Sequence, residues 1–435
     1  MAITPNACQQ KAVDAFIKLL MNTNQKELII CGYPGTGKTS LTGYLVDNLP
    51  KFIKSAGSLG KKIPDYKVCV TATTRQASAE VAARLGTEPR TIHSLLGLLL
   101  KNNYSTGETY LALSPNAEII HNTILFIDEG SYIDDNLKEK IRDRVGDTCK
   151  IIYTGDKWQL LMPNVMTAAI FDDPDISQVE MTTVERHSGA IAGAAADYRN
   201  AIITGNFPAI PTSGKEVMHV DGPTFQQLIN HTFTTDFVPN KSGKIIAWSN
   251  LKVQAYNDYI GQARGLTKLV QAGETLITNK PIMGANRVLA SGDTLVKISR
   301  TTPTTEKGIQ GAMVEIANSV EIFVPDNMGE ATALMKAYAK KKDWSKYFHI
   351  KDNWGDLRPS FSSTVYKAQG STFDRVFIDL TNIGCCPEPS TFARMMNVAI
   401  SRAAKQVFLY GDLPKKYLGS THAHINDYLP EKLSA

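Results

Sequence analysis

The stretch CGYPGTGKTSL, residues 31–41, decides how the rest of the chain is interpreted. It follows an apolar run at residues 28–31, and apolar residues recur after it at near-helical spacing, so it joins a strand to a helix. It fills every fixed position of the pattern G-x-x-x-x-G-K-[ST], in which backbone N–H groups surround phosphates and the lysine adds a cation. Residues 32–39 therefore predict a loop that binds a nucleoside triphosphate, rather than a glycine-rich turn before a surface helix.

The composition is that of an ordinary globular protein. The 435 residues are 43% hydrophobic and 20% charged, and this length suggests two or three domains. No run of 18 apolar residues occurs, and the polar start MAITPNACQQ lacks the features of a secretory signal. We therefore expect a soluble, cytoplasmic protein without a membrane partner. Its six cysteines lack C-x-x-C spacing and should be reduced thiols. The net charge of +5 permits a polyanionic partner without requiring one.

Two further strand ends carry side chains suited to triphosphate chemistry. In TILFIDEGS, residues 124–127 are typical of a strand buried on both faces of a parallel sheet, and Asp128 and Glu129 follow. After a phosphate loop, this pair predicts one carboxylate that supports Mg²⁺ and another that polarises the attacking water. In KIIYTGDKWQLL, Gln159 is placed to sense the γ-phosphate; the alternative is a surface glutamine after a helix cap at Asp156.

The order of blocks along the chain is more informative than any single block. The blocks are Q-x-x-A-V, GYPGTGKT, TATTRQASAEV, TIHSLL, IDEGS, GDKWQL, VERHS, AWSN, STVYKAQGSTFDRVFIDL and NVAISRA. This order resembles that of superfamily 1 helicases, in particular the small phage Dda-type enzymes and their RecD-like relatives (SF1B). The resemblance runs from residue 9 to about residue 410. Its most specific parts are VYKAQGSTFD and VAISRA, because phosphate loops occur in many families.

The resemblance implies an α/β fold with two RecA-like motor domains, each a parallel sheet flanked by helices. It also implies an ATP- and Mg²⁺-dependent DNA helicase that moves 5′ to 3′ on single-stranded DNA and unwinds forked duplex DNA in replication, recombination or repair. A single-strand-binding protein or replisome components are further candidate partners, and a phage-encoded protein would act in the host cytoplasm. Three alternatives stay open: a translocase without strong unwinding, a viral-type RNA helicase, and a non-motor P-loop kinase or regulator.

The resemblance also assigns roles at the nucleotide. The residues that would contact the nucleotide are Gln9, at the adenine, and Gly35, Thr36, Gly37, Lys38, Thr39, Ser40 and Gly370. Thr39 and Asp128 would hold Mg²⁺. The catalytic set would be Lys38, Asp128, Glu129, Gln159, Arg186 and Arg402. The two arginines are expected to reach the γ-phosphate across an interdomain cleft. Guanidinium groups stabilise charge on the transferring phosphoryl group, so this arrangement would make hydrolysis depend on cleft closure.

The resemblance places a second set of residues on the nucleic acid. These are Thr71, Thr73, Thr74, Thr91, His93, Ser94, Tyr110, Asn250, Thr364, Lys367 and Ser371. Hydroxyls and backbone N–H groups at strand ends can hold phosphates whatever the base. Asn397 departs from the family, which usually has tyrosine there, and this puts a stacking role in doubt. Trp158 is expected either to stack on a base or to lie in the core.

We expect four segments along the chain. Residues 1–187 would form motor domain 1A, with a pin insertion at about 98–121; residues 188–264 and 359–435 would form motor domain 2A; residues 265–358 would form an SH3-like insertion, 2B. The turn-rich passage at 101–115 predicts a hairpin. The resemblance to Dda-like enzymes implies that this hairpin is the pin, with Tyr104 or Tyr110 meeting the first unpaired base. Short β-rich runs in 2B predict a small barrel. Residues 331–348 predict one basic amphipathic helix, whose Lys340, Lys341 and Lys342 are solvated or track DNA.

Overall fold

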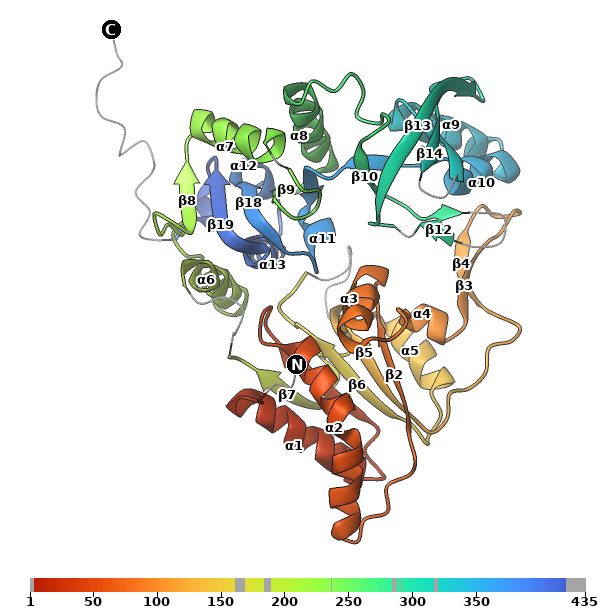
Figure 1. Ribbon diagram of the computed structural model, residues 1–435, viewed down its shortest axis with the longest axis vertical. Coiled ribbons are helices and arrows are strands. Elements are labelled where there is room, and N and C mark those ends of the chain that lie inside the picture. Colours follow the sequence, from red (N-terminus) through yellow and green to blue (C-terminus); the bar gives the residue numbers. More distant parts are fainter. Residues whose placement is uncertain are drawn as a thin grey trace. The chain divides into compact units, whose positions relative to one another are not determined.

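The computed structural model describes residues 4–160, 169–183, 189–235, 237–283, 288–290, 292–316 and 320–419. The chain divides into two compact units, whose elements are labelled in Figure 1. Unit 1 comprises Met1–Lys157, Leu161–Arg186 and Lys268–Pro359, and unit 2 comprises Trp158–Leu160, His187–Thr267 and Ser360–Ala435. All six cysteines are free thiols. Among the described helices, none has the length and apolar character needed to cross a membrane.

Unit 1 is built on a five-stranded parallel sheet in the order β2-β5-β6-β1-β7. Its strands are β1 (Glu27–Gly32), β2 (Lys67–Ala72), β5 (Thr123–Asp128), β6 (Lys150–Gly155) and β7 (Ser177–Met181). Its helices are α1 (Ala7–Met21), α2 (Lys38–Ser58), α3 (Arg75–Leu85), α4 (Ile92–Leu95) and α5 (Asp135–Arg144), with a 3₁₀ turn, η1 (Gly130–Tyr132). The predicted strand at residues 124–127 is confirmed as the buried centre of β5.

The central strands of this sheet are buried on both faces. Leu125 and Ile127 of β5 lie in one apolar cluster, whereas Ile124 and Phe126 lie in another that includes α1 and α2. This alternation is the period of two that a strand imposes on its side chains. Burying one side chain as large as Phe126 contributes about 2–3 kcal/mol. The helices on both faces thus fix the sheet whose carboxyl edge carries the candidate site.

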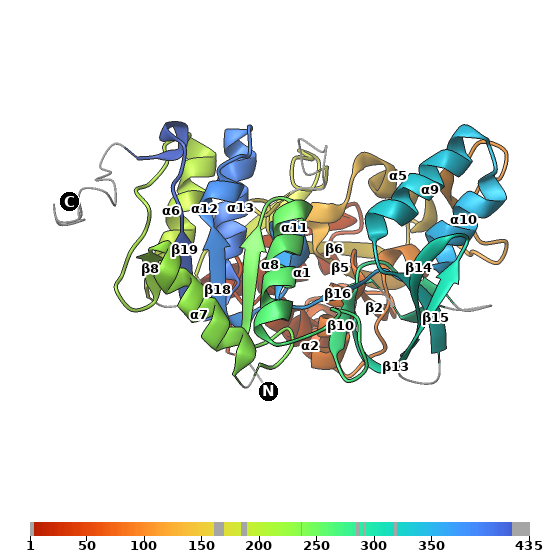
Figure 2. The ribbon, with the colours of Figure 1, turned by 90° about the horizontal axis from the view of Figure 1, so that it is seen from above.

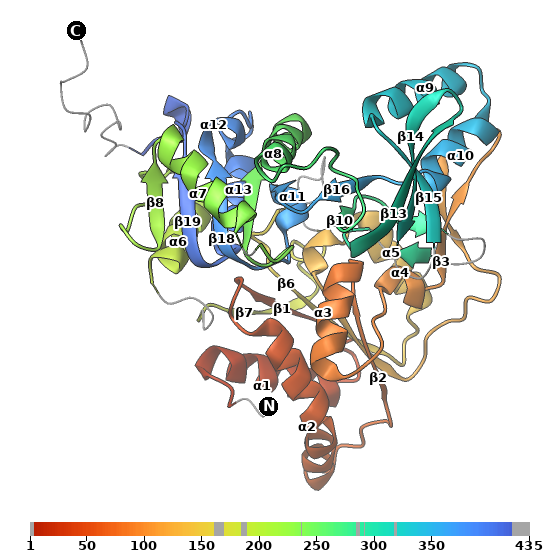
Figure 3. The same ribbon diagram turned by 45° about the horizontal axis from the view of Figure 1, so that its top comes forward.

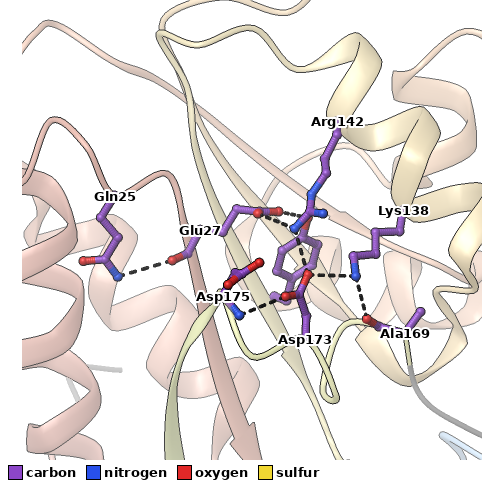
Figure 4. A network of polar contacts seen from close by, with 8 residues as sticks. Gln25, Glu27, Lys138, Arg142, Ala169, Asp173 and Asp175 are labelled. Atoms are coloured by element: carbon purple, nitrogen blue, oxygen red, sulfur yellow. Dashed lines mark hydrogen bonds and ion pairs between the residues drawn. The ribbon is translucent and has the colours of Figure 1, made fainter.

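A network of ion pairs ties α5 to the start of β1 (Figure 4). Arg142 donates to Glu27 at 2.8 Å and to Asp173 at 2.9 Å, and the Lys138 ammonium lies 2.8 Å from the same Asp173 carboxylate. The hydrogen bond from Lys138, with further donors including Arg142, lowers the pKa of Asp173 to about 2. The network therefore depends on an ionised Asp173.

The insertion in unit 1 is an antiparallel sheet in the order β15-β14-β13-β10-β16. Its elements are β10 (Thr275–Thr278), β13 (Leu295–Glu306), β14 (Ile309–Ile316), β15 (Val320–Pro325) and β16 (Leu357–Pro359), with the short pair β11 (Ile282–Met283) and β12 (Val288–Ala290). Its closure into a barrel stays a prediction.

The basic segment that follows β15 forms two helices, α9 (Met328–Lys340) and α10 (Trp344–Asn353), so the prediction of one continuous helix is wrong. Lys342 has φ 55°, a left-handed conformation that ends α9. Asp343 then caps α10 by accepting from the backbone N–H of Lys346 at 3.3 Å. A chain reversal and a new cap outweigh the continuous helical periodicity of the sequence.

A two-stranded antiparallel hairpin, β3 (Leu98–Asn102) and β4 (Thr109–Leu113), extends from the parallel-sheet part of unit 1 and packs on α10 (Figures 1 and 3). Gly107, at its tip, lies so close to the Trp344 ring that a Cβ atom there would overlap the ring. The Tyr104 and Phe348 rings meet edge to face, with centroids 5.0 Å apart. Nearby, the Asn102 side chain donates to Asp352 at 2.6 Å. These contacts hold the hairpin tip against the insertion.

Unit 2 is built on a second five-stranded parallel sheet, in the order β17-β9-β18-β19-β8. Its strands are β8 (Val217–Val220), β9 (Gly243–Ala247), β17 (Ser362–Thr364), β18 (Phe373–Asp379) and β19 (Ala403–Tyr410). Its helices are α6 (Ala190–Thr204), α7 (Gly222–Thr234), α8 (Asn250–Ala263), α11 (Val365–Ala368), α12 (Leu380–Ile383) and α13 (Pro389–Ser401), with a 3₁₀ turn, η2 (Lys415–Tyr417). In Figure 2, α7 and α8 lie on one face of the sheet and α6 and α13 on the other, as their separate apolar clusters require.

Candidate functional site

The phosphate loop connects β1 to α2 in unit 1. Gly35 and Gly37 have φ values of 83° and 82°, in the left-handed region that favours glycine. Gly37 is the N-cap of α2 and contributes no side-chain cap. Backbone N–H groups and the positive end of the helix dipole therefore face the loop, which is the arrangement that binds phosphate. Thr39 and Ser40 lie in the first turn of the same helix.

Lys38 folds back over the loop. Its ammonium donates to the carbonyl oxygens of Gly32, at 2.7 Å, and Tyr33, at 3.1 Å. The hydroxyl of the fully buried Thr36 also donates to Tyr33, at 2.9 Å, so this side chain shapes the loop from within. A phosphate would compete with the two carbonyls for the Lys38 ammonium. The loop is thus closed on itself by groups that a triphosphate can replace.

Gln9 joins α1 to the phosphate loop. Its side chain accepts from the Asn6 backbone N–H at 3.0 Å and completes a capping box at the start of α1. Its Nε2 atom donates to the Thr36 carbonyl at 3.2 Å. Only 2% of Gln9 is exposed. Gln9 therefore lies beside the loop, and its predicted adenine contact stays a prediction.

Asp128 and Glu129 follow β5, at the same carboxyl edge of the sheet as the phosphate loop. The Oδ1 atom of Asp128 accepts from the Thr154 hydroxyl at 2.6 Å and from the Glu129 backbone N–H at 2.9 Å. Thr154 lies near the end of β6, between β5 and β1, and sequence reasoning missed it. Glu129 has φ 56°, which costs a residue with a side chain about 1 kcal/mol or more. The hydroxyl of Thr73, another predicted nucleic-acid residue, donates to the backbone carbonyl of Glu129 at 3.0 Å.

The threonines and serine predicted to hold nucleic acid in unit 1 fall into two groups. Thr74 and Thr91 cap α3 and α4, and a parallel bridge between Ala72 and Thr91 brings their loops together. Ser94 is exposed in the same short helix. In contrast, the Thr71 hydroxyl donates to the Phe126 carbonyl at 3.0 Å and is 1% exposed, so it lies inside the sheet.

The remaining two candidates in unit 1 are His93 and Tyr110. Burial lowers the pKa of His93, against the opposing charge of Asp134, and so favours a neutral ring. Tyr110 lies on β4 opposite Lys101 and is 49% exposed. Arg186, predicted to reach the γ-phosphate, falls outside the described residues.

In unit 2, the candidate residues of the KAQG and SRA blocks come together. Arg402 donates to the carbonyls of Val398, at 3.1 Å, and Ser371, at 3.3 Å, and to the Ser401 hydroxyl at 3.0 Å. Gly370, before Ser371, has φ 81°. The guanidinium is therefore held at the junction of these two blocks.

The segment Trp158–Leu160 belongs to unit 2, although it follows β6 in the chain. The Gln159 carbonyl accepts from Arg394 at 2.8 Å, and the residue is 4% exposed. Asn397 is fully buried and donates to the Trp158 carbonyl at 3.5 Å, which accounts for a small polar residue at this position. Sequence reasoning did not find Arg394, because this contact joins residues 235 positions apart.

The other nucleic-acid candidates of unit 2 lie near helix starts. Thr364 caps α11 by accepting from the Lys367 backbone N–H at 3.4 Å. Lys367 is exposed, and so is Asn250, the first residue of α8. These positions present polar groups at the ends of β17 and β9.

Two family models match the chain in the order of its two sheets. A model described as an AAA domain matches residues 4–210, and a model of the UvrD-like helicase C-terminal domain matches residues 359–410. A curated relative, the ATP-dependent DNA helicase dda of Enterobacteria phage T4, is 24% identical, with 85% of this chain and 91% of that protein covered. These matches confirm the resemblance to Dda-type superfamily 1 helicases.

Solved structures of Pif1 helicases are also similar to this chain. The Pif1 helicase from Bacteroides in complex with ADP-AlF3 and ssDNA is 15% identical, with 98% of this chain and 97% of that chain covered and a TM-score of 0.49. The Pif1 helicase from Candida albicans is 13% identical, with 97% and 98% covered and the same TM-score.

Proposed function

We propose that this protein is an ATP-dependent DNA helicase that translocates on single-stranded DNA. The observation that carries the proposal is the presence of two parallel sheets in one chain. The first has a phosphate loop and Asp128 at the same carboxyl edge, and the second has Arg402 fixed against Ser371. A kinase or nucleotide-binding regulator needs only the first sheet. The dda relative, which covers both, is by name an ATP-dependent DNA helicase.

At the nucleotide, each predicted residue has a distinct task. In this proposal the start of α2 and Lys38 hold the phosphates, and Gln9, whose side chain donates to the Thr36 carbonyl of the loop, contacts the base. Thr39 and Asp128 supply one hydroxyl and one carboxylate, oxygen ligands of the kind that Mg²⁺ combines with nucleotide phosphates. The cation would neutralise charge on those phosphates. Thr154 orients the Asp128 carboxylate, and Glu129 orients water for attack.

In this proposal, unit 2 makes ATP hydrolysis depend on both units of the protein. Arg402 of unit 2, acting with Arg186 of unit 1, stabilises charge on the γ-phosphate in the ATP-bound state, so that hydrolysis requires both units. In the same proposal, Gln159 contacts the γ-phosphate and so senses whether ATP is bound. Contacts with the nucleic acid are made to phosphates, through helix starts such as those capped by Thr74 and Thr364, because a stepping motor cannot depend on base identity.

The hairpin β3–β4 is the proposed pin that separates the strands. Its tip is held by α10, and Tyr110 presents a half-exposed ring. In this assignment, residues 1–187 form motor domain 1A, residues 188–264 and 359–435 form motor domain 2A, and residues 265–358 form an SH3-like domain 2B. Translocation from 5′ to 3′ is part of the proposal and rests on the resemblance alone.

The variant Lys38→Ala tests the central assignment. It should abolish ATP hydrolysis stimulated by single strands while circular dichroism stays that of the wild type. Duplexes with only a 5′ or only a 3′ tail, made of DNA or RNA, then test polarity and substrate. Single-strand-stimulated hydrolysis that survives in Lys38→Ala would contradict the proposal. Hydrolysis by the wild type without unwinding would instead favour a translocase.

A further inference from the structure

The positive charge of the chain is concentrated in one short segment. Residues 336–353 contain six lysines and two aspartates, a formal net charge of +4, whereas the whole chain carries +5. The rest of the chain therefore carries a net charge of only +1. The segment spans the end of α9, the turn after it and α10. Such a local excess attracts a polyanion that the chain as a whole would attract weakly.

Four of these lysines form an exposed surface, here named the lysine ridge: Lys336, Lys340, Lys341 and Lys342. Within the described ranges, none of the four makes an ion pair. The negative end of the α9 dipole favours Lys340, Lys341 and Lys342, which lie in its last turn or directly after it, but not Lys336, one turn earlier. Lys346, next along the chain, is instead paired with Asp343 at 2.7 Å. The ridge thus retains charge that no carboxylate of the described structure neutralises.

A lysine from another element adds to this surface. Lys307, on the exposed turn between β13 and β14, contributes to the lowered pKa of Asp343, after the larger effect of the hydrogen bond from Lys346. Lys307 therefore lies near the turn between α9 and α10. Two elements separated in the chain present lysines to one region.

The lysine ridge is held beside the hairpin tip. Lys342 is two residues before Trp344, whose ring packs on Gly107. Two residues span at most about 7 Å. The ridge and the hairpin tip are therefore neighbours within unit 1, fixed by the same turn.

The aromatic rings of α9 and α10, the helices that carry the ridge, are engaged in packing. The Trp344 ring covers Gly107, Phe348 is buried, and the Tyr338 ring lies 5.5 Å from the Lys346 ammonium. Single strands are bound by exposed rings on which bases stack, whereas the bases of a duplex are already stacked and its affinity comes mainly from phosphates that contact lysines. The two helices of the ridge therefore offer lysines without rings available for stacking, an arrangement that favours a duplex over a single strand.

We propose that the lysine ridge binds the phosphate backbone of duplex DNA immediately ahead of the strand-separating hairpin. This inference rests on the proposed helicase function. The ridge would keep the duplex aligned with the hairpin while the motor pulls one strand.

The test uses full-length protein with Lys340, Lys341 and Lys342 changed to Gln. A matched control changes Lys54, Lys61 and Lys62, three exposed lysines at the end of α2 and after it, to Gln. Binding of a short blunt DNA duplex is measured by fluorescence anisotropy across a salt series, and binding of a single strand of equal length is measured beside it. The ridge variant should bind the duplex about tenfold more weakly. In a plot of the logarithm of the binding constant against the logarithm of the salt concentration, the magnitude of the slope should fall by about 0.9 for each phosphate that the variant no longer neutralises.

Single-strand binding and single-strand-stimulated ATP hydrolysis should be those of the wild type in the ridge variant. Unchanged duplex affinity, an equal loss of single-strand affinity, or the same loss in the control variant would each overturn the inference. A wild-type protein without single-strand-stimulated hydrolysis would instead defeat the proposed function. The two failures are therefore distinguishable.

Discussion

At the scale of single residues, Thr154 is the least expected part of the site. Its hydroxyl donates to Asp128 at 2.6 Å and fixes the carboxylate proposed to hold Mg²⁺. Thr154→Val keeps the shape of the side chain and removes the donor. We expect turnover to fall by about tenfold or more, with a higher Mg²⁺ requirement, because partners of metal ligands have effects of that size. Single-strand-stimulated hydrolysis measured against Mg²⁺ concentration checks this.

The control for Thr154→Val is Thr123→Val. The Thr123 hydroxyl donates to the His121 carbonyl at 2.8 Å, at the start of the strand that ends in Asp128. This variant should keep the wild-type Mg²⁺ requirement. If both variants lost activity equally, the role of Thr154 would be general packing.

Some site residues are defined by their spacing along the chain, and others are defined only by which strands lie side by side in the fold. The phosphate loop and Asp128 are defined by local spacing, so the sequence alone predicts both. Thr154 acquires its role only because β5 and β6 are neighbours, and no spacing encodes that. For the same reason Thr71, predicted to hold nucleic acid, instead bonds the Phe126 carbonyl within the sheet.

At the scale of elements, the ion-pair network on α5 gives a pH dependence. Asp173 has a folded pKa of about 2, below its ordinary value of 3.8. Its ionisation therefore stabilises the fold above pH 3.8, and this stabilisation is lost as pH falls from about 4 to about 2. Asp173→Asn should lower the free energy of unfolding at pH 7 by about 2 kcal/mol, since hydrogen bonds to charged groups contribute that much.

Urea unfolding of the wild type and Asp173→Asn, followed by circular dichroism from pH 7 to pH 3, measures this difference. It should shrink as pH falls below 4. Asp175→Asn is the control, because the Asp175 backbone, not its side chain, contacts Asp173. A difference that stayed constant with pH would contradict the assignment.

The hairpin β3–β4 yields a second prediction at this scale. Replacing Tyr104 and Tyr110 together by Ala should reduce the base pairs separated per ATP several-fold, because the rings would no longer meet the fork. Single-strand-stimulated hydrolysis should persist, since neither residue lies near the phosphate loop in the sequence. Changing both residues to Phe keeps the rings and is the control. Unwinding per ATP that matches the wild type in the Ala variant would exclude the hairpin as the pin.

The element boundaries show where sequence patterns are weakest. Both parallel sheets follow from apolar runs and motif order. The division of the basic segment into α9 and α10 does not, because helical periodicity continues through Lys341. Only the left-handed backbone at Lys342 and the cap at Asp343 end one helix and begin the next.

At the scale of the whole molecule, the proposal requires separate contributions from the two units. Lys38 lies in unit 1 and Arg402 in unit 2. Arg402→Lys should therefore retain nucleotide binding and lose most hydrolysis, because a lysine cannot reproduce the fork of guanidinium donors. Lys38→Ala should lose both. Binding of a fluorescent ATP analogue, with turnover measured in parallel, separates the two outcomes.

Arg375→Lys serves as the control in unit 2. Arg375 contacts Gln406 and Thr232. This variant should hydrolyse ATP as the wild type does. Full turnover in Arg402→Lys would show that hydrolysis needs no guanidinium from unit 2.

The packing of Gly107 on Trp344 has a mechanical consequence. A two-stranded ribbon alone is marginally stable in water and would bend under load. Here the tip of the ribbon is buttressed by a ring that lies 237 residues away in the sequence, and the fit leaves no room for even a methyl group. Force applied at the tip is therefore shared with the β-rich insertion, and stiffness at this point is a property of two distant segments together.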